Sequence, residues 1–248
     1  MNKIVFFDVD GTLLPANAGR IPKSTESALL RLKENGIGIV LCTGRHPHEI
    51  VDFQSIPFDG YVLLNGQLCL DEKKAPIFTN PIKGENKKSL LQLFNEKNIP
   101  VILVELDRLY MNIHSKEAAQ VQHECSIPLY PIEEYRGADI LMSTIFTDKD
   151  IHIGDLTVAR WHTWACDVYN PGDGKSRGVK FFLDRLGIAR ENAYAFGDAY
   201  NDIDMIRFAG TGIAMGNAYT ETKAAADYVT DTADHDGIAK ALKHFSLI

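Results

Sequence analysis

The chain has 248 residues, 45% of them hydrophobic and 24% charged, with a formal net charge of -7 and a pI near 5.6. This length suits one sizeable α/β domain, or a core domain with a smaller one, and the composition excludes a disordered or repetitive protein. Lysine and arginine form no run beyond isolated pairs on an acidic chain, so a nucleic-acid backbone is a disfavoured partner.

Short apolar runs and one helical pattern alternate in the first third of the chain. The helical pattern has Ser24 or Thr25 as its expected N-cap and Gly36 as its expected stop. Such alternation is the βαβ signature of a parallel sheet. The predicted segments are strands at residues 4–7, 37–42 and 61–64 and a helix at residues 24–35.

The pattern changes in the middle of the chain, where hairpins are typical. Asp107 and Arg108 form a tight turn between two apolar runs. We predict an inserted α+β module at residues 83–170, with linkers near residues 80–84 and 170–174. Its expected elements are a helix at residues 87–97 and strands at residues 101–106, 109–113, 140–146, 158–162 and 164–168.

The last third returns to the alternation of the first. An apolar helix face ends at Gly187, and strands and helices follow it. The predicted fold is therefore a Rossmann-like, doubly wound parallel α/β core at residues 1–82 and 171–248, interrupted by the cap at residues 83–170. The helix face comprises Val179, Phe182, Leu183 and Leu186; strands are expected at residues 193–196 and 212–215, and a last helix at residues 237–245.

Polar residues and a glycine follow each expected strand of the parallel sheet. In doubly wound sheets ligands bind beyond the carboxyl ends of the strands, so these residues mark a candidate site. Asp8 and Asp10 would repel each other there unless a cation lies between them or one takes up a proton. The segments are Asp8-Val9-Asp10-Gly11-Thr12, Thr43-Gly44-Arg45, Asn65-Gly66 and Gly197-Asp198-Ala199-Tyr200-Asn201-Asp202.

Several of these residues also have a purely structural interpretation. Asp198, Asn201 and Asp202 belong to the types that cap helices, and Thr43 could satisfy the backbone at a strand end. Lys175 could be an ordinary solvated lysine. These alternatives stay open, whereas a turn needs only one of the two aspartates at the first strand.

Four stretches in this order resemble the haloacid dehalogenase superfamily, in particular its Cof-like sugar-phosphatase branch with a C2-type cap inserted after the third strand. They are D-V-D-G-T at residues 8–12, T-G-R at 43–45, the lysine of N-P-G-D-G-K at 175 and G-D-A-Y-N-D at 197–202, with G-I-A-M-G-N-A at 212–218 as support. The resemblance implies a phosphatase that hydrolyses small phosphorylated metabolites, such as sugar or cofactor phosphates, through an aspartyl-phosphate.

The resemblance also implies a role for each motif residue. Asp8 would be the nucleophile, and Asp10 would transfer protons to the leaving group and from water. Mg²⁺ would be held by a side-chain oxygen of Asp8, the backbone carbonyl of Asp10 and the carboxylate of Asp198, with Asp202 orienting a metal-bound water. The phosphate would be bound by Thr43, Gly44, Lys175, Asn201 and Arg45, the last of which has pairing with a neighbouring acid as its alternative.

Other residues have weaker expectations. Thr12 is expected to hold the turn and orient Asp10, and Asn65 to bond the loop bearing Asp8 or to touch ligand. His46 and His48 are expected to be surface loop residues. On the expected cap strands, core packing is the favoured role, with a place at the substrate pocket as its alternative, for Tyr110, Trp161 and Trp164.

Two positions depart from the family pattern. Ala199 stands where a small hydroxyl or a glycine is frequent, and Ser176 follows Lys175 where glycine is usual. Neither change removes a reactive group. The alternatives in function are a phosphomutase of the same superfamily and a catalytically silent protein that binds a phosphorylated ligand.

The remaining expectations concern location and partners. The chain has four scattered cysteines without a C-x-x-C pair, which disfavours a zinc site or a disulfide framework. No segment resembles a signal peptide or a membrane span, so a cytoplasmic location is expected. The expected partner is a small phosphate-ester substrate, with no nucleic acid and no membrane, and the protein is expected to be a monomer or a small homo-oligomer.

Overall fold

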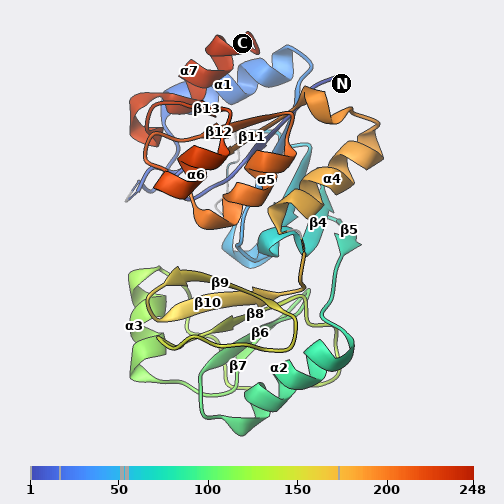
Figure 1. The fold of residues 1–248 in the computed structure, drawn as a ribbon, viewed down its shortest axis with the longest axis vertical. Coiled ribbons are helices and arrows are strands. Elements are labelled where there is room, and N and C mark those ends of the chain that lie inside the picture. Colours follow the sequence, from blue (N-terminus) through green and yellow to red (C-terminus); the bar gives the residue numbers. More distant parts are fainter. Residues whose placement is uncertain (1, 17, 51–52, 54–55, 173) are drawn as a thin grey trace. The chain divides into compact units, whose positions relative to one another are not determined.

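The computed structural model describes residues 2–16, 18–50, 53, 56–172 and 174–248. The chain forms two compact units, one made of Met1–Phe78 with Asp173–Ile248 and the other of Thr79–Gly172 (Figure 1). The borders expected from the sequence lie a few residues away from these. Each unit has its own sheet and its own apolar core.

The first unit is built on an eight-stranded sheet. Its strands are Ile4–Phe7 (β1), Gly38–Cys42 (β2), Gly60–Leu63 (β3), Leu68–Asp71 (β4), Pro76–Thr79 (β5), Ala193–Gly197 (β11), Thr211–Ala214 (β12) and Tyr228–Val229 (β13). They lie in the order β13-β12-β11-β1-β2-β3-β4-β5. All pairs from β13 to β3 are parallel, and β4 is antiparallel to β3. Strand β1, which Asp8 follows, is therefore one of the two central strands.

Helices cover both faces of this sheet, as the prediction of a doubly wound fold requires (Figure 1). They are Lys23–Glu34 (α1) and Gly237–His244 (α7) on one face, and Lys175–Leu186 (α4), Ile203–Phe208 (α5) and Thr220–Ala225 (α6) on the other. Strands β1, β2 and β3 are consequently buried at every position. Ile4 and Phe6 pack with Val179 and Phe182 of α4 in the core of one face.

The start of α1 differs from the prediction. The N-cap is Pro22, which makes no side-chain capping bond, and the helix begins at Lys23 rather than after Ser24 or Thr25. The Ser24 hydroxyl instead donates to the Asp236 carboxylate, a partner far away in the sequence. Gly36 has a φ of +70°, the left-handed conformation expected of a helix stop.

The inserted unit begins at Thr79, a few residues before the predicted border at residue 83, but its place among the strands differs from the resemblance. The resemblance placed it after the third strand, but β4 and β5 intervene. Strand β4 follows β3 after a single 3-10 turn, Leu64–Gly66 (η2), and β5 is an edge strand that begins with a proline and is only partly buried. Such short strands carry little periodic signal, which is why the sequence did not reveal them.

The second unit is an antiparallel sheet with two helices. Leu90 and Phe94 of its first helix pack against Tyr110 in the core. Its elements are Gly84–Glu96 (α2), Val101–Val104 (β6), Leu109–Met111 (β7), Lys116–Glu124 (α3), Met142–Ile145 (β8), Thr157–His162 (β9) and Ala165–Tyr169 (β10), with the strands in the order β7-β6-β8-β10-β9. The sequence did not predict α3.

Two of the three aromatic residues assigned to the core of this unit are not there. Tyr110 is buried, and its hydroxyl donates to Glu105 at 2.7 Å. Trp161 and Trp164 are 40% and 37% exposed. The Trp161 indole donates to Asp167 at 3.1 Å, and Trp164 lies in the turn between β9 and β10.

No helix in the described part of the chain combines the length and the apolar character needed to cross a membrane.

Candidate active site

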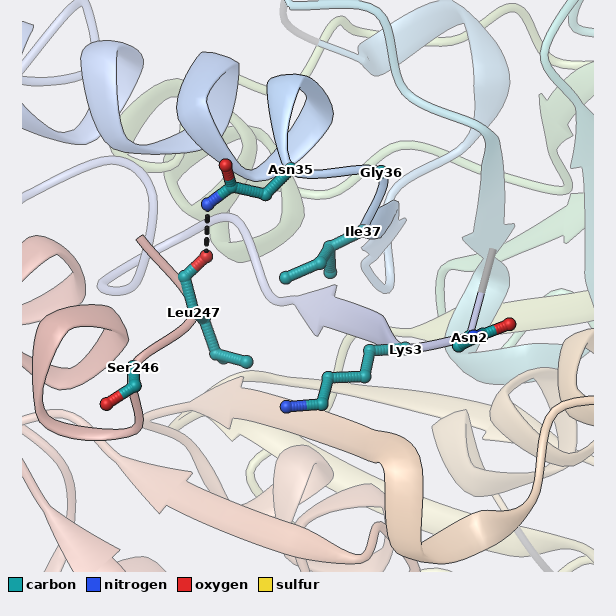
Figure 2. A pocket seen from close by; sticks show the side chains of 7 residues that line it. All are labelled: Asn2, Lys3, Asn35, Gly36, Ile37, Ser246 and Leu247. Atoms are coloured by element: carbon teal, nitrogen blue, oxygen red, sulfur yellow. Dashed lines mark hydrogen bonds between the residues drawn. The ribbon is translucent and has the colours of Figure 1, made fainter.

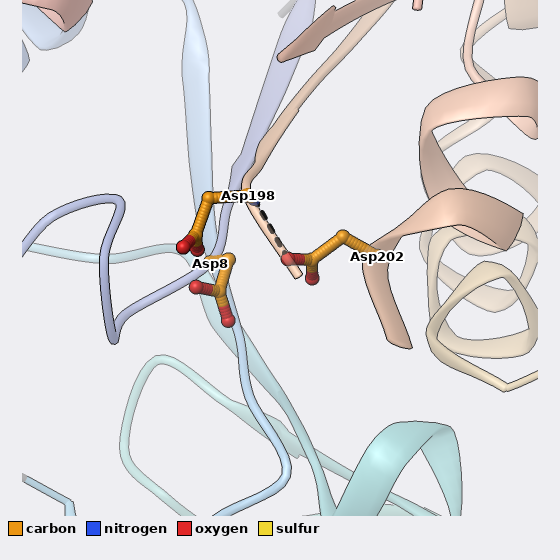
Figure 3. Close-up of side chains that lie close together, drawn as sticks. All are labelled: Asp8, Asp198 and Asp202. Carbon is orange, nitrogen blue, oxygen red and sulfur yellow. Dashed lines mark hydrogen bonds between the residues drawn. The ribbon is translucent and has the colours of Figure 1, made fainter. Parts of the chain in front are cut away.

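Three carboxylates gather at the carboxyl ends of the central strands of the first unit. Asp8 follows β1 and Asp198 follows β11, while Asp202 ends the 3-10 turn Tyr200–Asp202 (η4). Each offers one oxygen within 4.8 Å of the others, and Figure 3 shows the side chains converging. The sequence predicted that these residues lie together at one edge of the sheet.

A buried lysine neutralises part of this cluster. The Lys175 ammonium lies 2.6 Å from an oxygen of Asp8 and 2.6 Å from an oxygen of Asp202, and the side chain is 0% exposed. Burial alone would lower the pKa of Lys175, but the charges of Asp202 and Asp8 raise it above its ordinary value. The lysine is therefore a fixed cation and not the solvated side chain of the structural alternative.

One ammonium among three carboxylates leaves an excess of negative charge. Burial, followed by the charge of Asp202, raises the pKa of Asp8 well above its ordinary value, although Lys175 works against this shift. Burial and then Asp202 likewise raise the pKa of Asp198 to about 7, while a hydrogen bond from Thr12 lowers it. Buried carboxylates that are costly to ionise alone are ready ligands for a cation.

A hard divalent cation fits this donor set. Mg²⁺ binds oxygen ligands at about 2.0–2.1 Å, so opposite ligands of an octahedron are about 4 Å apart. The oxygens of Asp8, Asp198 and Asp202 lie within 4.8 Å of one another, close to this span. Asp202 binds Lys175 through one oxygen and two backbone N–H groups through the other, so the side chains of Asp8 and Asp198 are the more available donors.

Backbone and hydroxyl groups hold the cluster in place. One oxygen of Asp202 accepts from the backbone N–H groups of Asp198 and Ala199, both at 2.9 Å. The Thr12 hydroxyl donates to Asp198 at 3.2 Å, which corrects the expectation that Thr12 orients Asp10. Gly11 has a φ of +83°, and a Cβ there would lie 2.1 Å from an Asp198 oxygen. The first loop is thus shaped around Asp198.

The carboxylate of Asp10 lies apart from the cluster. It is 58% exposed, and Arg45 donates to both of its oxygens, from Nε at 2.9 Å and from Nη2 at 2.6 Å. The hydrogen bond that Arg45 donates to Asp10 also raises the pKa of Arg45. Asp8 and Asp10 therefore have different cationic partners, Lys175 and Arg45.

The other residues predicted to bind phosphate follow β2 and β11. Thr43 is buried, and its hydroxyl oxygen accepts from the backbone N–H of Arg45 at 3.2 Å. Asn201 donates to the side-chain oxygen of Asn65 at 3.0 Å. A Cβ on Gly44 would lie 3.1 Å from that Asn65 amide. These contacts bring the loops after β2, β3 and β11 together.

Asn217 also belongs to the acidic site, although the sequence analysis included it only within the supporting segment at residues 212–218. Its amide donates to the backbone carbonyl of Gly11 at 2.8 Å and to Asp198 at 3.4 Å. The available signal was its position just after β12, the next strand of the same parallel sheet. His46 also differs from expectation, because it is buried and its Nδ1 accepts from the His48 backbone.

A cavity of about 570 Å³ lies at the opposite edge of the same sheet, where β1 and β2 begin (Figure 2). Lys3 is its one ionisable side chain, so it lacks the acid and base groups that a reaction needs. The better candidate for a reaction site is therefore the carboxylate cluster at the carboxyl ends of the strands. The lining residues are Asn2, Lys3, Asn35, Gly36, Ile37, Ser246 and Leu247.

The doubly wound sheet, the inserted unit and this acidic edge define a hydrolase of the haloacid dehalogenase type. The family model of haloacid dehalogenase-like hydrolases matches residues 5–242, and the chain belongs to this family. The predictions of the family with its Cof-like branch, of the fold class and of the enzyme class, a phosphoric monoester hydrolase, are confirmed.

Individual relatives match the chain over its whole length. YkrA of Bacillus subtilis (strain 168) is 30% identical, covering 100% of this chain and 99% of the relative. The solved structure of the phosphatase BT1666 from Bacteroides thetaiotaomicron is 30% identical with a TM-score of 0.92, covering 100% and 96% of the two chains. That of the subclass IIB sugar phosphatase BT4131 is 32% identical with a TM-score of 0.87, covering 99% and 100%.

Proposed function

We propose that this protein is a Mg²⁺-dependent phosphatase of small phosphorylated metabolites, such as sugar or cofactor phosphates. The observation that carries the proposal is the fixed ammonium of Lys175 beside the Asp8, Asp198 and Asp202 cluster. Phosphoryl transfer needs a placed nucleophile and cations that balance charge on the transferring oxygens. The site has a buried carboxylate for the first task and a buried ammonium for the second.

In the first step, a carboxylate oxygen of Asp8 attacks phosphorus and the ester bond to the leaving oxygen breaks. The leaving oxygen takes a proton from Asp10 and departs as an alcohol, which leaves an aspartyl-phosphate on Asp8. The Lys175 ammonium donates to Oδ1 of Asp8 at 2.6 Å. This bond fixes the orientation of the carboxylate and so the direction from which its other oxygen attacks.

In the second step, water attacks the phosphorus of the aspartyl-phosphate and the bond to Asp8 breaks. Asp10 takes the proton of that water, inorganic phosphate leaves and Asp8 is restored. The Asp10 carboxylate is exposed, and Arg45 fixes its orientation through two hydrogen bonds, so the proton exchange requires one Asp10 oxygen to leave Arg45.

The Mg²⁺ ion would be held by a side-chain oxygen of Asp8, the backbone carbonyl of Asp10 and the carboxylate of Asp198, with Asp202 oriented toward a bound water. When bound, such an ion supplies positive charge that offsets the charge of the phosphate. Thr43 and the N–H of Gly44 would donate to the phosphate, and Asn201 would reach it by leaving Asn65. Arg45 is assigned to Asp10, on its hydrogen bonds.

The proposed substrate class is small phosphate esters. Support comes from similarity to a sugar phosphatase across the full chain. A panel of phosphorylated sugars, nucleotides and cofactors, assayed for phosphate release with and without Mg²⁺, identifies the substrate class. Activity near zero across the whole panel would contradict the proposal.

The nucleophile assignment predicts the effect of Asp8→Asn. The amide cannot form the aspartyl-phosphate, so turnover of p-nitrophenyl phosphate should fall by at least about a thousandfold in a folded protein. Asp184→Asn is the matched control, because Asp184 is exposed on α4. Appreciable turnover by Asp8→Asn, above that of a buffer blank, would remove Asp8 from this role.

A further inference from the structure

The first turn of α4 has no capping side chain of its own. Its N-cap is Gly174, and Lys175 is the first residue of the helix. The first N–H groups of a helix have no partner within it, and the Ser176 N–H is one of these. Yet this turn has to place a fully buried ammonium against two carboxylates, Asp8 and Asp202.

Asp204 of the neighbouring helix α5 supplies the missing cap. Its Oδ2 accepts from the Ser176 backbone N–H at 2.9 Å, and Ser176 also bonds this carboxylate through its hydroxyl. A carboxylate at this position interacts favourably with the helix dipole. Helices α4 and α5 lie side by side on the same face of the sheet (Figure 1).

The Asp204 cap leaves one of its own carboxylate oxygens without a hydrogen bond in the described part of the chain. Oδ1 of Asp204 is buried and has no hydrogen-bond partner among the described residues. A buried oxygen without a partner costs free energy, and burial raises the pKa of Asp204 while hydrogen bonds from Ser176 and from the Met205 backbone lower it. A serine or threonine N-cap within α4 would satisfy the helix without this cost.

The geometry around α4 has the form of a two-point clamp. Asp202 and Asp204, two residues apart, bind two consecutive residues of α4: Asp202 holds the side chain of Lys175, and Asp204 holds the main chain of Ser176. A lysine side chain has a long flexible stem, so its ammonium stays at one place only if its backbone does too. The second contact of the clamp fixes that backbone.

We propose that Asp204 is a positioning residue of the active site: through the first turn of α4 it holds the Lys175 ammonium between Asp8 and Asp202. Only the kinetic consequence of this inference, an effect on kcat, rests on the proposed function. The placement of the ammonium is a property of the fold and is measurable without substrate.

The kinetic test compares two substitutions of Asp204 with Asp184→Ala, the same change at an exposed site on α4. Asp204→Ala removes the acceptor, so kcat for p-nitrophenyl phosphate should fall about 10- to 100-fold with KM within about threefold of wild type, because a misplaced lysine misaligns Asp8. Asp204→Asn keeps an acceptor oxygen and should retain kcat within about threefold. Asp184→Ala should match the wild type.

The second test follows the ammonium protons of Lys175 by NMR, with Lys175→Met used to assign the signal. Buried and bonded to two carboxylates, these protons should exchange slowly with water in the wild type and in Asp204→Asn. In Asp204→Ala the exchange should be at least about tenfold faster. If Asp204→Ala does not fold, Asp204→Ser replaces it, because a serine hydroxyl is too short to reach Ser176.

The outcomes are separable. Unchanged ammonium exchange in Asp204→Ala, or kcat within twofold of wild type in that variant, would overturn the positioning role. A wild-type protein that hydrolyses no phosphate ester would overturn the proposed function instead, and the exchange measurement would still decide the role of Asp204. An equal loss of kcat in Asp204→Asn and Asp204→Ala would also overturn the positioning role of Asp204, since the acceptor oxygen would then be irrelevant.

Discussion

Gly11 is the residue that most narrowly limits the shape of the acidic site. Its backbone is left-handed, and any side chain would begin 2.1 Å from the Asp198 carboxylate. Asn217 ties the carbonyl of the same glycine to the loop after β12. The small size of this one residue therefore allows two loops from distant parts of the sequence to meet around Asp198.

Gly11→Ala should displace Asp198 and weaken metal binding. We expect the increase in melting temperature caused by millimolar Mg²⁺ to be lost or strongly reduced, together with at least about a hundredfold loss of turnover. Gly19→Ala is the control, since a Cβ at Gly19 meets nothing within 4 Å. A normal Mg²⁺ response in Gly11→Ala would show that the loop has room to adjust.

The raised pKa of Asp198 predicts how stability depends on pH without metal. Folding raises this pKa from 3.8 to about 7, so between these pH values the folded protein binds a proton that the unfolded chain releases. Stability should therefore fall as pH rises through this window, and the shift of Asp8 has the same sign.

Thermal unfolding with a chelator present should thus show a melting temperature that declines by several degrees from pH 5 to pH 7.5. Asp198→Asn should make this decline shallower, because the amide does not titrate. Saturating Mg²⁺ should oppose the decline, since it binds the ionised carboxylates. A metal-free melting temperature that rises with pH would contradict the assignment.

At the scale of elements, the close packing of α4 on β3 determines the position of the first turn of α4, which carries Lys175. A Cβ on Gly178 would lie 2.2 Å from a methyl carbon of Val62, and one on Gly66 would lie 2.0 Å from the Gly174 carbonyl. The helix can approach the sheet only because these positions lack side chains. Its first turn consequently reaches the carboxyl edge, next to Asp8.

Gly178→Ala separates packing from helix propensity. Propensity alone predicts stabilisation by about 0.5–1 kcal/mol, whereas the contact with Val62 predicts destabilisation by about 1–3 kcal/mol. Urea unfolding measures the sign. The double variant with Val62→Ala should be less destabilised than the sum of the two single variants, because the smaller residue makes room for the new methyl group. Strict additivity would exclude a direct clash.

Elements with long periodic patterns were predictable from sequence, and short or locally polar ones were not. Helices α1, α4 and α7 and the buried strands β1, β2, β3 and β11 follow from apolar periodicity, because burial on one or both faces imposes it. Strand β5 and helix α3 were not predicted, since they are short or carry few buried residues. Their positions depend on contacts with elements that are distant in the sequence.

At the scale of the whole molecule, the inserted unit has its own core and a closed base. The Asn170 amide donates to the carbonyls of Asn80 and Pro81 at 2.9 and 3.0 Å, which joins the two ends of the insertion. Both tryptophans of the chain, Trp161 and Trp164, belong to this unit. Tryptophan fluorescence therefore reports on the insertion alone.

This placement predicts two separable unfolding transitions. Mg²⁺ at a hundredfold excess over its dissociation constant should stabilise the first unit by about 2.7 kcal/mol and shift its urea transition, followed by circular dichroism. The tryptophan fluorescence transition should not move. Coincident transitions that shift together would mean that the two units unfold as one.

The sequence by itself determined the parallel sheet, the presence of an insertion and the set of polar residues at the strand ends. It could do so because burial imposes periodicity on strands, and because reactive residues in this order are specific to one family. Only the tertiary structure decided which polar groups pair: Lys175 with Asp8 and Asp202, Arg45 with Asp10, and the Thr12 hydroxyl with Asp198. It also decided that Trp161 and Trp164 are exposed. The physical reason is that pairing depends on distances between side chains far apart in the chain, and such distances are fixed only when the elements pack.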